Sequence, residues 1–262
     1  MSKIRHGDTG RTLIYGVHPV VENIKAGHRK VYEIFLAKGS EAEKRLGPEF
    51  ERLKLSIRHL SGIELDSLTR DVKNQGIAAR VEPFPYNDFE TNLLELDKKE
   101  RFTVLILDQV QDPNNLGNIL RSACCFGVDL VVLLKDRAVS VTSSVEKASA
   151  GASAHVRICM VTNLSRSIEA LKRIGCWVYG ADAQNGVNYF EADLAPKIVF
   201  VMGTEGAGLR RLVRENCDVM IKVPITGAIE SLNVSNATSI LLAEVFRQSL
   251  SIKSKGRGQH NS

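Results

Sequence analysis

Three well-separated segments of the chain combine small and polar residues in a way that is typical of a ligand site. They run over 108–121, 202–209 and 230–237, and each one follows or abuts an apolar run. Ligand sites in parallel α/β sheets form at the carboxyl ends of strands, where residues of this kind would meet. We therefore interpret the three segments as parts of one pocket.

The first segment carries groups that would suit a phosphate or a ribose. Asn114 and Asn115 are favourable N-cap residues, so the helix that Gly117 is predicted to open presents free N–H groups to the pocket. A helical side chain leans toward the N-terminus of its helix, and Arg121 is therefore expected to reach back over Gly117 toward Asn115. The alternative is a capped helix that carries one surface arginine.

The second segment is a glycine-rich loop over 203–208. Its G-x-x-G-x-G spacing differs from the dinucleotide fingerprint, and no Walker A lysine follows. Glycines allow the backbone to approach a ligand closely, so a branched side chain at Gly203 is expected to fill space that a ligand needs. Glu205 is the one acid inside the loop. It is either a solvated surface charge or a carboxylate that orients Arg121.

The third segment places Ser231 and Asn233 in alternation with apolar residues, immediately before the last predicted helix. The apolar run 219–223, which Pro224 ends, is the strand that would lead into this segment. A local turn or a helix cap is the alternative interpretation of these two polar residues.

The composition is ordinary for a globular protein, with 262 residues of which 44% are hydrophobic and 25% charged. No apolar run approaches the ~20 residues that a membrane-spanning helix needs. Met1–His6 lacks an apolar signal core, so a cytoplasmic protein without a membrane partner is expected. The five cysteines include no C-x-x-C pair and the six histidines are scattered, so reduced thiols and no metal site are expected.

The positive charge is concentrated at the start of the chain. Residues 1–58 hold 12 Lys and Arg against 7 Asp and Glu, whereas the other residues hold 23 against 23. A basic segment on a neutral body indicates a nucleic-acid partner. A basic face that only keeps the protein in solution is an equally good interpretation of the charge alone.

The pattern of apolar residues changes near residue 102, and this change predicts two α/β parts. In 13–83, short helices are expected at 18–26, 41–55 and 62–71, and strands at 31–37, 56–60 and 76–82. A linker with one helix in it is expected over 84–101. Beyond it, near-continuous apolar runs alternate with helical stretches, which predicts a parallel, doubly wound sheet. The strands are expected at 103–107, 130–134, 156–161, 176–179, 198–202 and 219–223, and the helices at 117–126, 142–154, 164–174, 207–216 and 238–250.

The last predicted helix has a broad apolar face made of Leu241, Leu242, Val245 and Phe246. Such a face is wider than a free surface helix normally carries. Packing in the core of the unit is one interpretation, and an interface with a second subunit is the other.

Taken together, the motifs resemble those of the SpoU/TrmH family of RNA 2′-O-ribose methyltransferases. The matching stretches are 112–117 with Arg121, 203–208, 231–235 and a further stretch over 145–152. The resemblance covers about residues 102–249 and extends into 13–82, where Gly16–Glu22 and Gln75–Ala78 are the recognisable pieces.

This resemblance implies a fold and a cofactor. It implies a SPOUT α/β-knot catalytic domain with a parallel sheet and a deep trefoil knot over 102–250, preceded by an L7Ae/L30e-like RNA substrate-binding domain over 13–83 and a linker over 84–101. S-adenosylmethionine is expected to bind in the knot, against Gly203, Val223 and Leu232. Members of the family are homodimers packed through the first and last helices of the catalytic domain.

The resemblance also implies a reaction, the transfer of a methyl group to a ribose 2′-hydroxyl. The site is expected to be lined by Asn115, Arg121, Glu205, Ser231 and Asn233. Arg121 would act as the base or as a charged group that stabilises the developing alkoxide, and the second role suits a guanidinium better. A guanosine in 23S ribosomal RNA is the leading substrate, and a transfer RNA is the alternative.

Two other classes of protein remain as alternatives. One is a catalytically inactive RNA-binding or ribosome-assembly protein with the same fold, against which the intact motif residues argue. The other is a nucleotide-dependent α/β oxidoreductase. Two features of this chain argue against an oxidoreductase. Its glycines have a different spacing, and no well-placed acidic residue follows the first strand–helix turn.

Overall fold

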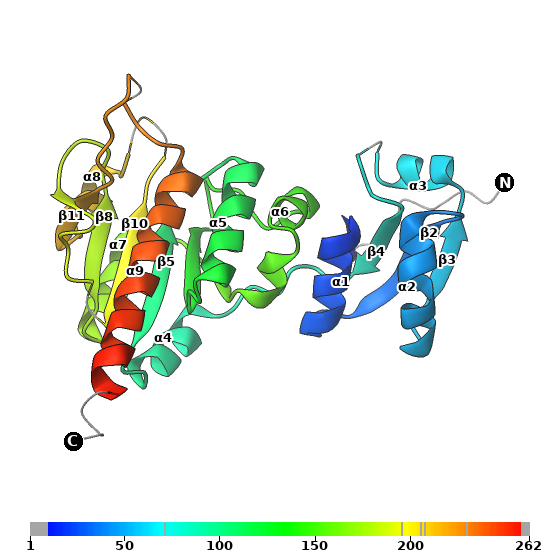
Figure 1. The fold of residues 1–262 in the computed structure, drawn as a ribbon, viewed down its shortest axis with the longest axis horizontal. Helices are drawn as coiled ribbons and strands as arrows, with labels where there is room; N and C mark the ends of the chain where they lie inside the picture. Colours follow the sequence, from blue (N-terminus) through cyan, green and yellow to red (C-terminus); the bar gives the residue numbers. More distant parts are fainter. Residues whose placement is uncertain are drawn as a thin grey trace. The chain divides into compact units, whose positions relative to one another are not determined.

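The computed structural model of the protein describes residues 10–70, 72–194, 196–204, 206, 208–228 and 230–257, with side chains up to residue 250. The chain forms two compact units, shown in Figure 1. We call the first the N-terminal unit; it comprises Met1–Pro85 and Val141–His155. The second, the C-terminal unit, comprises Tyr86–Ser140 and Val156–Ser262.

The N-terminal unit is a small mixed sheet with helices on both faces. Its described strands are β1 (Thr12–Tyr15), β2 (Val31–Ala37), β3 (Ile57–Leu60) and β4 (Ile77–Val81), in the order β1-β4-β2-β3. Only β2 and β3 run parallel among these neighbours. The helices α1 (Val17–Ala26) and α2 (Glu41–Arg52) pack on one apolar face, and α3 (Gly62–Leu68) packs on the other.

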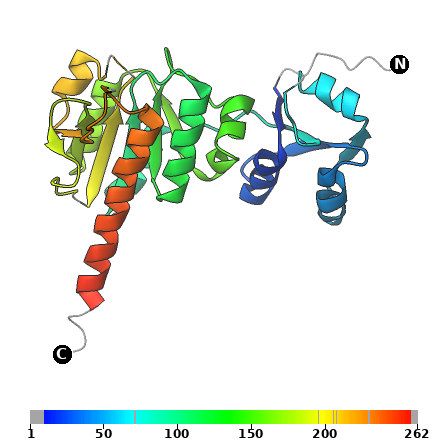
Figure 2. The same ribbon diagram turned by 45° about the horizontal axis from the view of Figure 1, so that its top comes forward.

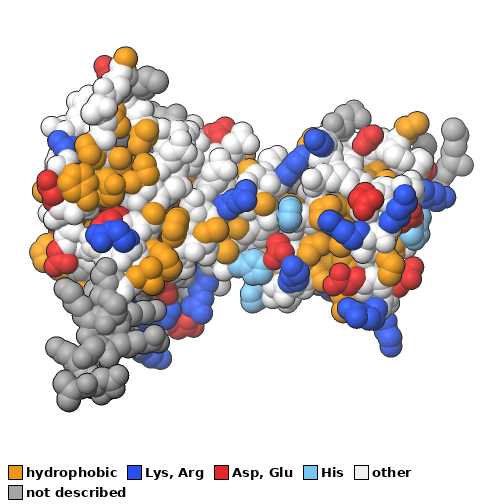
Figure 3. All heavy atoms as spheres, in the orientation of Figure 1, with side chains coloured by type: hydrophobic (Ala, Val, Ile, Leu, Met, Phe, Trp, Pro, Cys, Tyr) orange, Lys and Arg blue, Asp and Glu red, His pale blue; other side chains and the backbone are white. Residues whose placement is uncertain are grey.

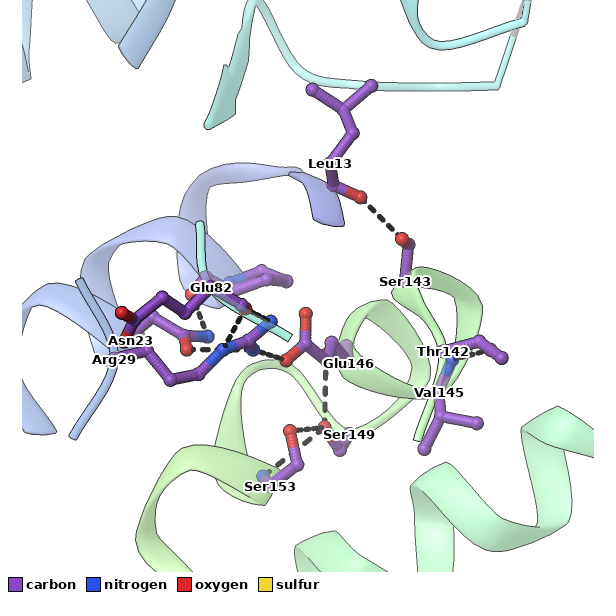
Figure 4. Close-up of polar contacts among 11 residues, drawn as sticks. Leu13, Asn23, Arg29, Glu82, Thr142, Ser143, Val145, Glu146, Ser149 and Ser153 are labelled. Atoms are coloured by element: carbon purple, nitrogen blue, oxygen red, sulfur yellow. Dashed lines mark hydrogen bonds and ion pairs between the residues drawn. The ribbon is translucent and has the colours of Figure 1, made fainter. Parts of the chain in front are cut away.

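A segment from much later in the chain completes this unit. It contains α6 (Ser143–Ala148) and the 3-10 helix η1 (Ala152–His155). Figure 4 shows Arg29 beside Glu146, and this ion pair is almost fully buried. Arg29 also donates its Nε proton to the carbonyl oxygen of Glu82 at 2.8 Å, and Ser143 donates to the carbonyl oxygen of Leu13. The segment 141–155 is therefore part of the N-terminal unit, although the sequence places it between two strands of the other unit.

The C-terminal unit is built on a parallel sheet, as the apolar runs predict. Its described strands are β5 (Phe102–Leu107), β6 (Leu130–Leu134), β7 (Ile158–Val161), β8 (Trp177–Ala181), β9 (Val187–Asn188), β10 (Lys197–Met202) and β11 (Val219–Lys222). They are ordered β7-β6-β5-β10-β8-β11-β9, and every neighbouring pair is parallel. Because β10 lies between β5 and β8, the ends of these three strands meet at one edge.

Helices cover both faces of this sheet. The residues of α4 (Phe89–Asp97), α7 (Leu164–Arg173) and α8 (Arg211–Glu215) share one hydrophobic core with the sheet. On the opposite face, α5 (Pro113–Cys125) and α9 (Val234–Arg257) pack side by side, which Figures 1 and 2 both show. The trefoil knot implied by the family resemblance stays a prediction.

Several helix boundaries differ from those predicted, for local reasons. α5 begins at Pro113 and not at Gly117, because the carboxylate of Asp112 accepts the N–H of Asn115 at 2.8 Å and caps the helix. The single helix expected over 142–154 is interrupted, because Ala150 and Gly151 adopt positive φ angles of 52° and 80°. α8 is shorter than the predicted 207–216, and α9 begins four residues before Thr238.

Candidate active site

A cavity of about 350 Å³ opens at the carboxyl edge of the parallel sheet, which is the edge that the motifs predict. Its volume lies within the range of about 300–1,000 Å³ that is usual for small-molecule sites. The walls come from the segments that follow β8, β10 and β11, together with the start of α9. The residues that line it include Asp182, Gln184, Asn185, Gly203, Thr204, Gly208, Arg214, Val223, Ser231, Leu232 and Leu241.

The glycine-rich wall is a loop closed by its own backbone. Thr204 and Gly208 exchange two backbone hydrogen bonds, of 3.2 Å and 3.0 Å. A Cβ atom on Gly203 would lie 2.3 Å from the carbonyl carbon and oxygen of Gly208, which no side chain can tolerate. The closure of the loop is therefore the first reason why a glycine is required at position 203. The space that a ligand needs, which the sequence indicated, is a second reason.

A buried carboxylate anchors the far end of this loop to the neighbouring strand. Asp108, at the end of β5, is 1% exposed and accepts the backbone N–H of Arg210 at 3.1 Å and its Nε proton at 2.7 Å. Asp108 lies in the first motif, but the sequence assigned it no role. The pair ties the first and second motifs together.

The residues predicted to hold a cofactor converge on the cavity. Gly203 comes from the end of β10, Val223 from the end of β11 and Leu232 from the third motif, and all three line it. Ser231 lines it as well. Their contact with a cofactor stays a prediction, but the geometry brings them to one place.

The first and third motifs meet through two asparagines. The side-chain amide of Asn233 donates to the side-chain oxygen of Asn115 at 2.9 Å. The oxygen of Asn233 is held in turn by the backbone N–H and the hydroxyl of Ser235, at 2.9 Å and 2.6 Å. This arrangement positions both asparagines next to the segment that carries Ser231 and Leu232.

Arg121 has an exposed side chain on α5, and Gly117 is buried one turn earlier. A large substrate can therefore reach the guanidinium. Glu205, the predicted partner of Arg121, lies outside the described residues. The convergence of these two side chains stays a prediction.

Two residues that line the cavity were not predicted from the sequence. Asp182 follows β8 and Arg214 belongs to α8, and both line the cavity. Asp182 carried a weak signal, since it is a polar residue just after a predicted strand. No sequence pattern marked Arg214, because its place beside Asp182 depends on the order of the strands in the sheet.

Other kinds of site are not found in the described part of the chain. No group of three or more His, Cys, Asp and Glu side chains there is arranged to hold a metal ion. None of the helices within the described ranges is long and apolar enough to cross a membrane.

Comparison with known proteins decides the family. The profile described as SpoU rRNA Methylase family matches residues 103–243, which is more than half of the chain. The chain belongs to the SpoU rRNA methylase family. A second profile, described as RNA 2′-O ribose methyltransferase substrate binding, matches residues 13–87 of this SpoU protein. Both matches confirm the resemblance that the motifs indicated.

Individual relatives agree with this assignment of the SpoU protein. A putative TrmH family tRNA/rRNA methyltransferase of Staphylococcus aureus (strain COL) is 40% identical over 240 residues, covering 90% of this chain and 96% of the relative. The SpoU methyltransferase AviRb from Streptomyces viridochromogenes, crystallised with AdoMet, has a TM-score of 0.78 at 23% identity, covering 94% and 95% of the two chains. A putative RNA methyltransferase of the TrmH family from Porphyromonas gingivalis has a TM-score of 0.71 at 25% identity, covering 91% and 90%.

Proposed function

We propose that the protein transfers a methyl group from S-adenosylmethionine to a ribose 2′-hydroxyl of RNA, with a guanosine of 23S ribosomal RNA as the leading target. The observation that carries the proposal is the hydrogen bond between Asn115 and Asn233, which brings two predicted catalytic residues together beside the cavity. Membership of an rRNA methylase family supports an RNA acceptor.

The volume of the cavity and the chemistry of its lining support the proposed cofactor. Val223, Leu232 and Leu241 provide apolar surface for an adenine ring, and Gly203, Thr204 and Gly208 provide backbone groups for the ribose. Asp182 and Arg214 provide charged groups. When bound, the cofactor supplies a methyl group already activated by its sulfonium, so the protein needs only to align the acceptor and assist loss of its proton.

Each predicted catalytic residue has a role that suits its chemistry. Arg121 carries a permanently charged fork that binds phosphate and stabilises the developing alkoxide. Asn115 and Asn233 orient the acceptor ribose, and Ser231 borders the cofactor. The role proposed for Glu205 is to orient Arg121 through paired hydrogen bonds.

The N-terminal unit is proposed to bind the RNA, which its match to a substrate-binding profile supports. One basic side chain of residues 1–58 is internal, because Arg29 is buried against Glu146 and is not available to RNA. Arg58, which lies 2.7 Å from Glu33, stays 53% exposed.

We further propose a homodimer that packs through α5 and α9. Leu241 and Leu242 are only 1% exposed, so half of the predicted apolar face lies in the core of the unit itself. Of the rest of that face, Val245 is partly buried and Phe246 is exposed, and Leu250 beyond it is exposed too. The ring of Phe246 lies 6.1 Å from that of Phe126, just after α5. Figure 3 shows hydrophobic side chains gathered over α5 and α9.

Incubation with labelled S-adenosylmethionine and with unmodified ribosomal and transfer RNAs tests the proposal. We expect label in 23S ribosomal RNA, at a single ribose that primer extension can map. Label in transfer RNA alone would support the second candidate, since the name of the relatives covers both transfer and ribosomal RNA. No label in either RNA would leave the inactive RNA-binding protein as the better interpretation.

A further inference from the structure

One wall of the cavity is charged and belongs to none of the three motifs. Asp182, which follows β8, accepts a hydrogen bond from Nη1 of Arg214 on α8 at 2.5 Å. Both residues line the cavity, and so do Gln184 and Asn185 next to Asp182. Among the described residues that line it, Arg214 is the one with a basic side chain.

The carboxylate of Asp182 is fixed by its own loop. One oxygen accepts the backbone N–H groups of Gln184 and Asn185, at 2.8 Å and 2.9 Å. Burial opposes the ionisation of Asp182, but these two N–H groups and Arg214 outweigh it and lower the pKa of the carboxyl below its ordinary value. Asp182 is therefore a charged and oriented partner for the guanidinium.

The loop that carries Asp182 is also held rigidly against the sheet. A Cβ atom on Gly186 would lie 2.4 Å from the carbonyl oxygen of Met220, so the loop is in close contact with β11 at this point. The backbone N–H of Asp182 donates to the carbonyl oxygen of Ile221 at 3.0 Å. Arg214 is thus presented to the cavity from a fixed position before any ligand binds.

Arg214 has more donors than Asp182 uses. A guanidinium carries five N–H protons in a planar fork, and the Arg214 side chain is 42% exposed. A fork of this kind matches a carboxylate, with which it forms paired, charge-assisted hydrogen bonds. The proposed cofactor ends in an amino acid, which carries one carboxylate and one ammonium group.

We propose that Arg214 binds the carboxylate of the amino-acid end of S-adenosylmethionine, and that Asp182 is the residue that positions it. The inference rests on the proposed function, since it assigns the orientation of the cofactor in the same cavity. The apolar walls then receive the adenosine part, and the charged wall receives the zwitterionic part.

Two ligands separate this role from a structural one. S-adenosylhomocysteine has the amino-acid end, whereas 5′-methylthioadenosine lacks it and keeps the adenosine and the sulfur. In calorimetry on the full chain, Arg214→Met should weaken S-adenosylhomocysteine by about 10- to 100-fold, as expected for losing charged hydrogen bonds. Its affinity for 5′-methylthioadenosine should stay within about twofold of the unmodified protein, because that ligand has no group for Arg214 to bind.

Matched variants complete the test. Arg211→Met removes an exposed arginine that pairs with Glu215 on the same helix, and it should leave both affinities unchanged. Asp182→Asn should weaken S-adenosylhomocysteine alone, and less than Arg214→Met does. Arg214→Lys keeps a charge without the fork, so an intermediate loss is expected even if the methionine variant proves unstable.

The outcomes that overturn the proposal are distinct from those that overturn the proposed function. Equal weakening of both ligands by Arg214→Met or Arg214→Lys would show that Arg214 only shapes the cavity. Unchanged binding of both, with a raised KM for RNA, would assign Arg214 to an RNA phosphate instead. Failure of the unmodified protein to bind either adenosine ligand would refute the cofactor itself.

Discussion

Asn233 donates a side-chain hydrogen bond of 2.9 Å to Asn115, although 118 positions separate them in the chain. The contact joins the start of α5 to the segment that precedes α9, and these two helices also pack side by side. Packing of the two helices therefore sets the geometry of the pair.

This contact predicts that the two asparagines act as a unit. Asn115→Ala and Asn233→Ala should each slow methyl transfer, and the double variant should be little worse than either single one. Residues in contact usually show coupling of about 0.5–3 kcal/mol, which a double-mutant cycle on single-turnover rates measures. Strictly additive effects would mean that the two side chains act independently.

Arg121→Ala should slow methyl transfer by about 10²–10³-fold and leave cofactor binding close to normal, because one preorganised donor at a developing oxyanion is lost. Arg121→Lys should also be slow, since a point charge cannot replace the planar fork. Arg166→Ala, an exposed arginine on α7, is the matched control. A loss far beyond this range at Arg121 would favour its role as the base.

Gly203→Val should open the glycine-rich loop, because its Cβ atom would collide with the backbone of Gly208. We expect loss of cofactor binding together with a lower melting temperature, and not a folded protein that merely lacks ligand space. Gly62→Ala, which meets nothing within 4 Å, should change neither quantity. Normal melting of Gly203→Val would contradict the loop contact.

Breaking the buried pair in the N-terminal unit should be strongly destabilising. Glu146→Ala leaves the Arg29 charge buried without its partner, which costs about 3–5 kcal/mol, whereas Arg29→Met combined with Glu146→Leu should recover most of that loss. Hydrogen exchange of peptides from 13–83 and 141–155 measures the effect.

The exposed Lys25, which pairs with Glu22, provides the control for that experiment, since surface pairs contribute only about 0–1 kcal/mol. Lys25→Ala should therefore leave exchange almost unchanged. Unaltered protection in Glu146→Ala would show that the segment 141–155 is held by its apolar contacts alone.

Sedimentation velocity at micromolar concentration tests the proposed dimer. The unmodified protein should sediment as a dimer, and Phe246→Asp should shift it toward a monomer by placing a charge in the apolar interface. Leu94→Asp alters an even more exposed side chain on α4, which packs on the opposite face of the sheet, and should not change the mass. A monomeric unmodified protein would refute the interface.

The parallel sheet and the position of the cavity at its carboxyl edge were predictable because their signals are local. Strands buried on both faces are continuous apolar runs, and Gly203 follows such a run directly, whereas Ser231 and Asn233 lie in the segment between the run 219–223 and the last helix. Their meeting point then follows from the rule that parallel strands end at one edge. The roles assigned to the individual residues came from the family resemblance.

The features that escaped prediction depend on contacts between distant segments. Arg214 reaches the cavity because β11 lies next to β8, and the pairing of strands that are not consecutive leaves no local pattern. Glu146 belongs to the N-terminal unit because it meets Arg29, 117 positions earlier in the chain. Leu241 and Leu242 were predicted to lie on an apolar face, and both are buried. Periodicity alone does not tell whether such a face packs on its own sheet or on another subunit.

The acceptor atom is the central claim, and a single substitution in the RNA tests it. Once the target nucleotide is mapped, an RNA with 2′-deoxyribose at that position should bind the protein and accept no methyl group. Methylation of that RNA at the same nucleotide would show that the acceptor is a base atom, and the assignment as a ribose 2′-O-methyltransferase would be wrong.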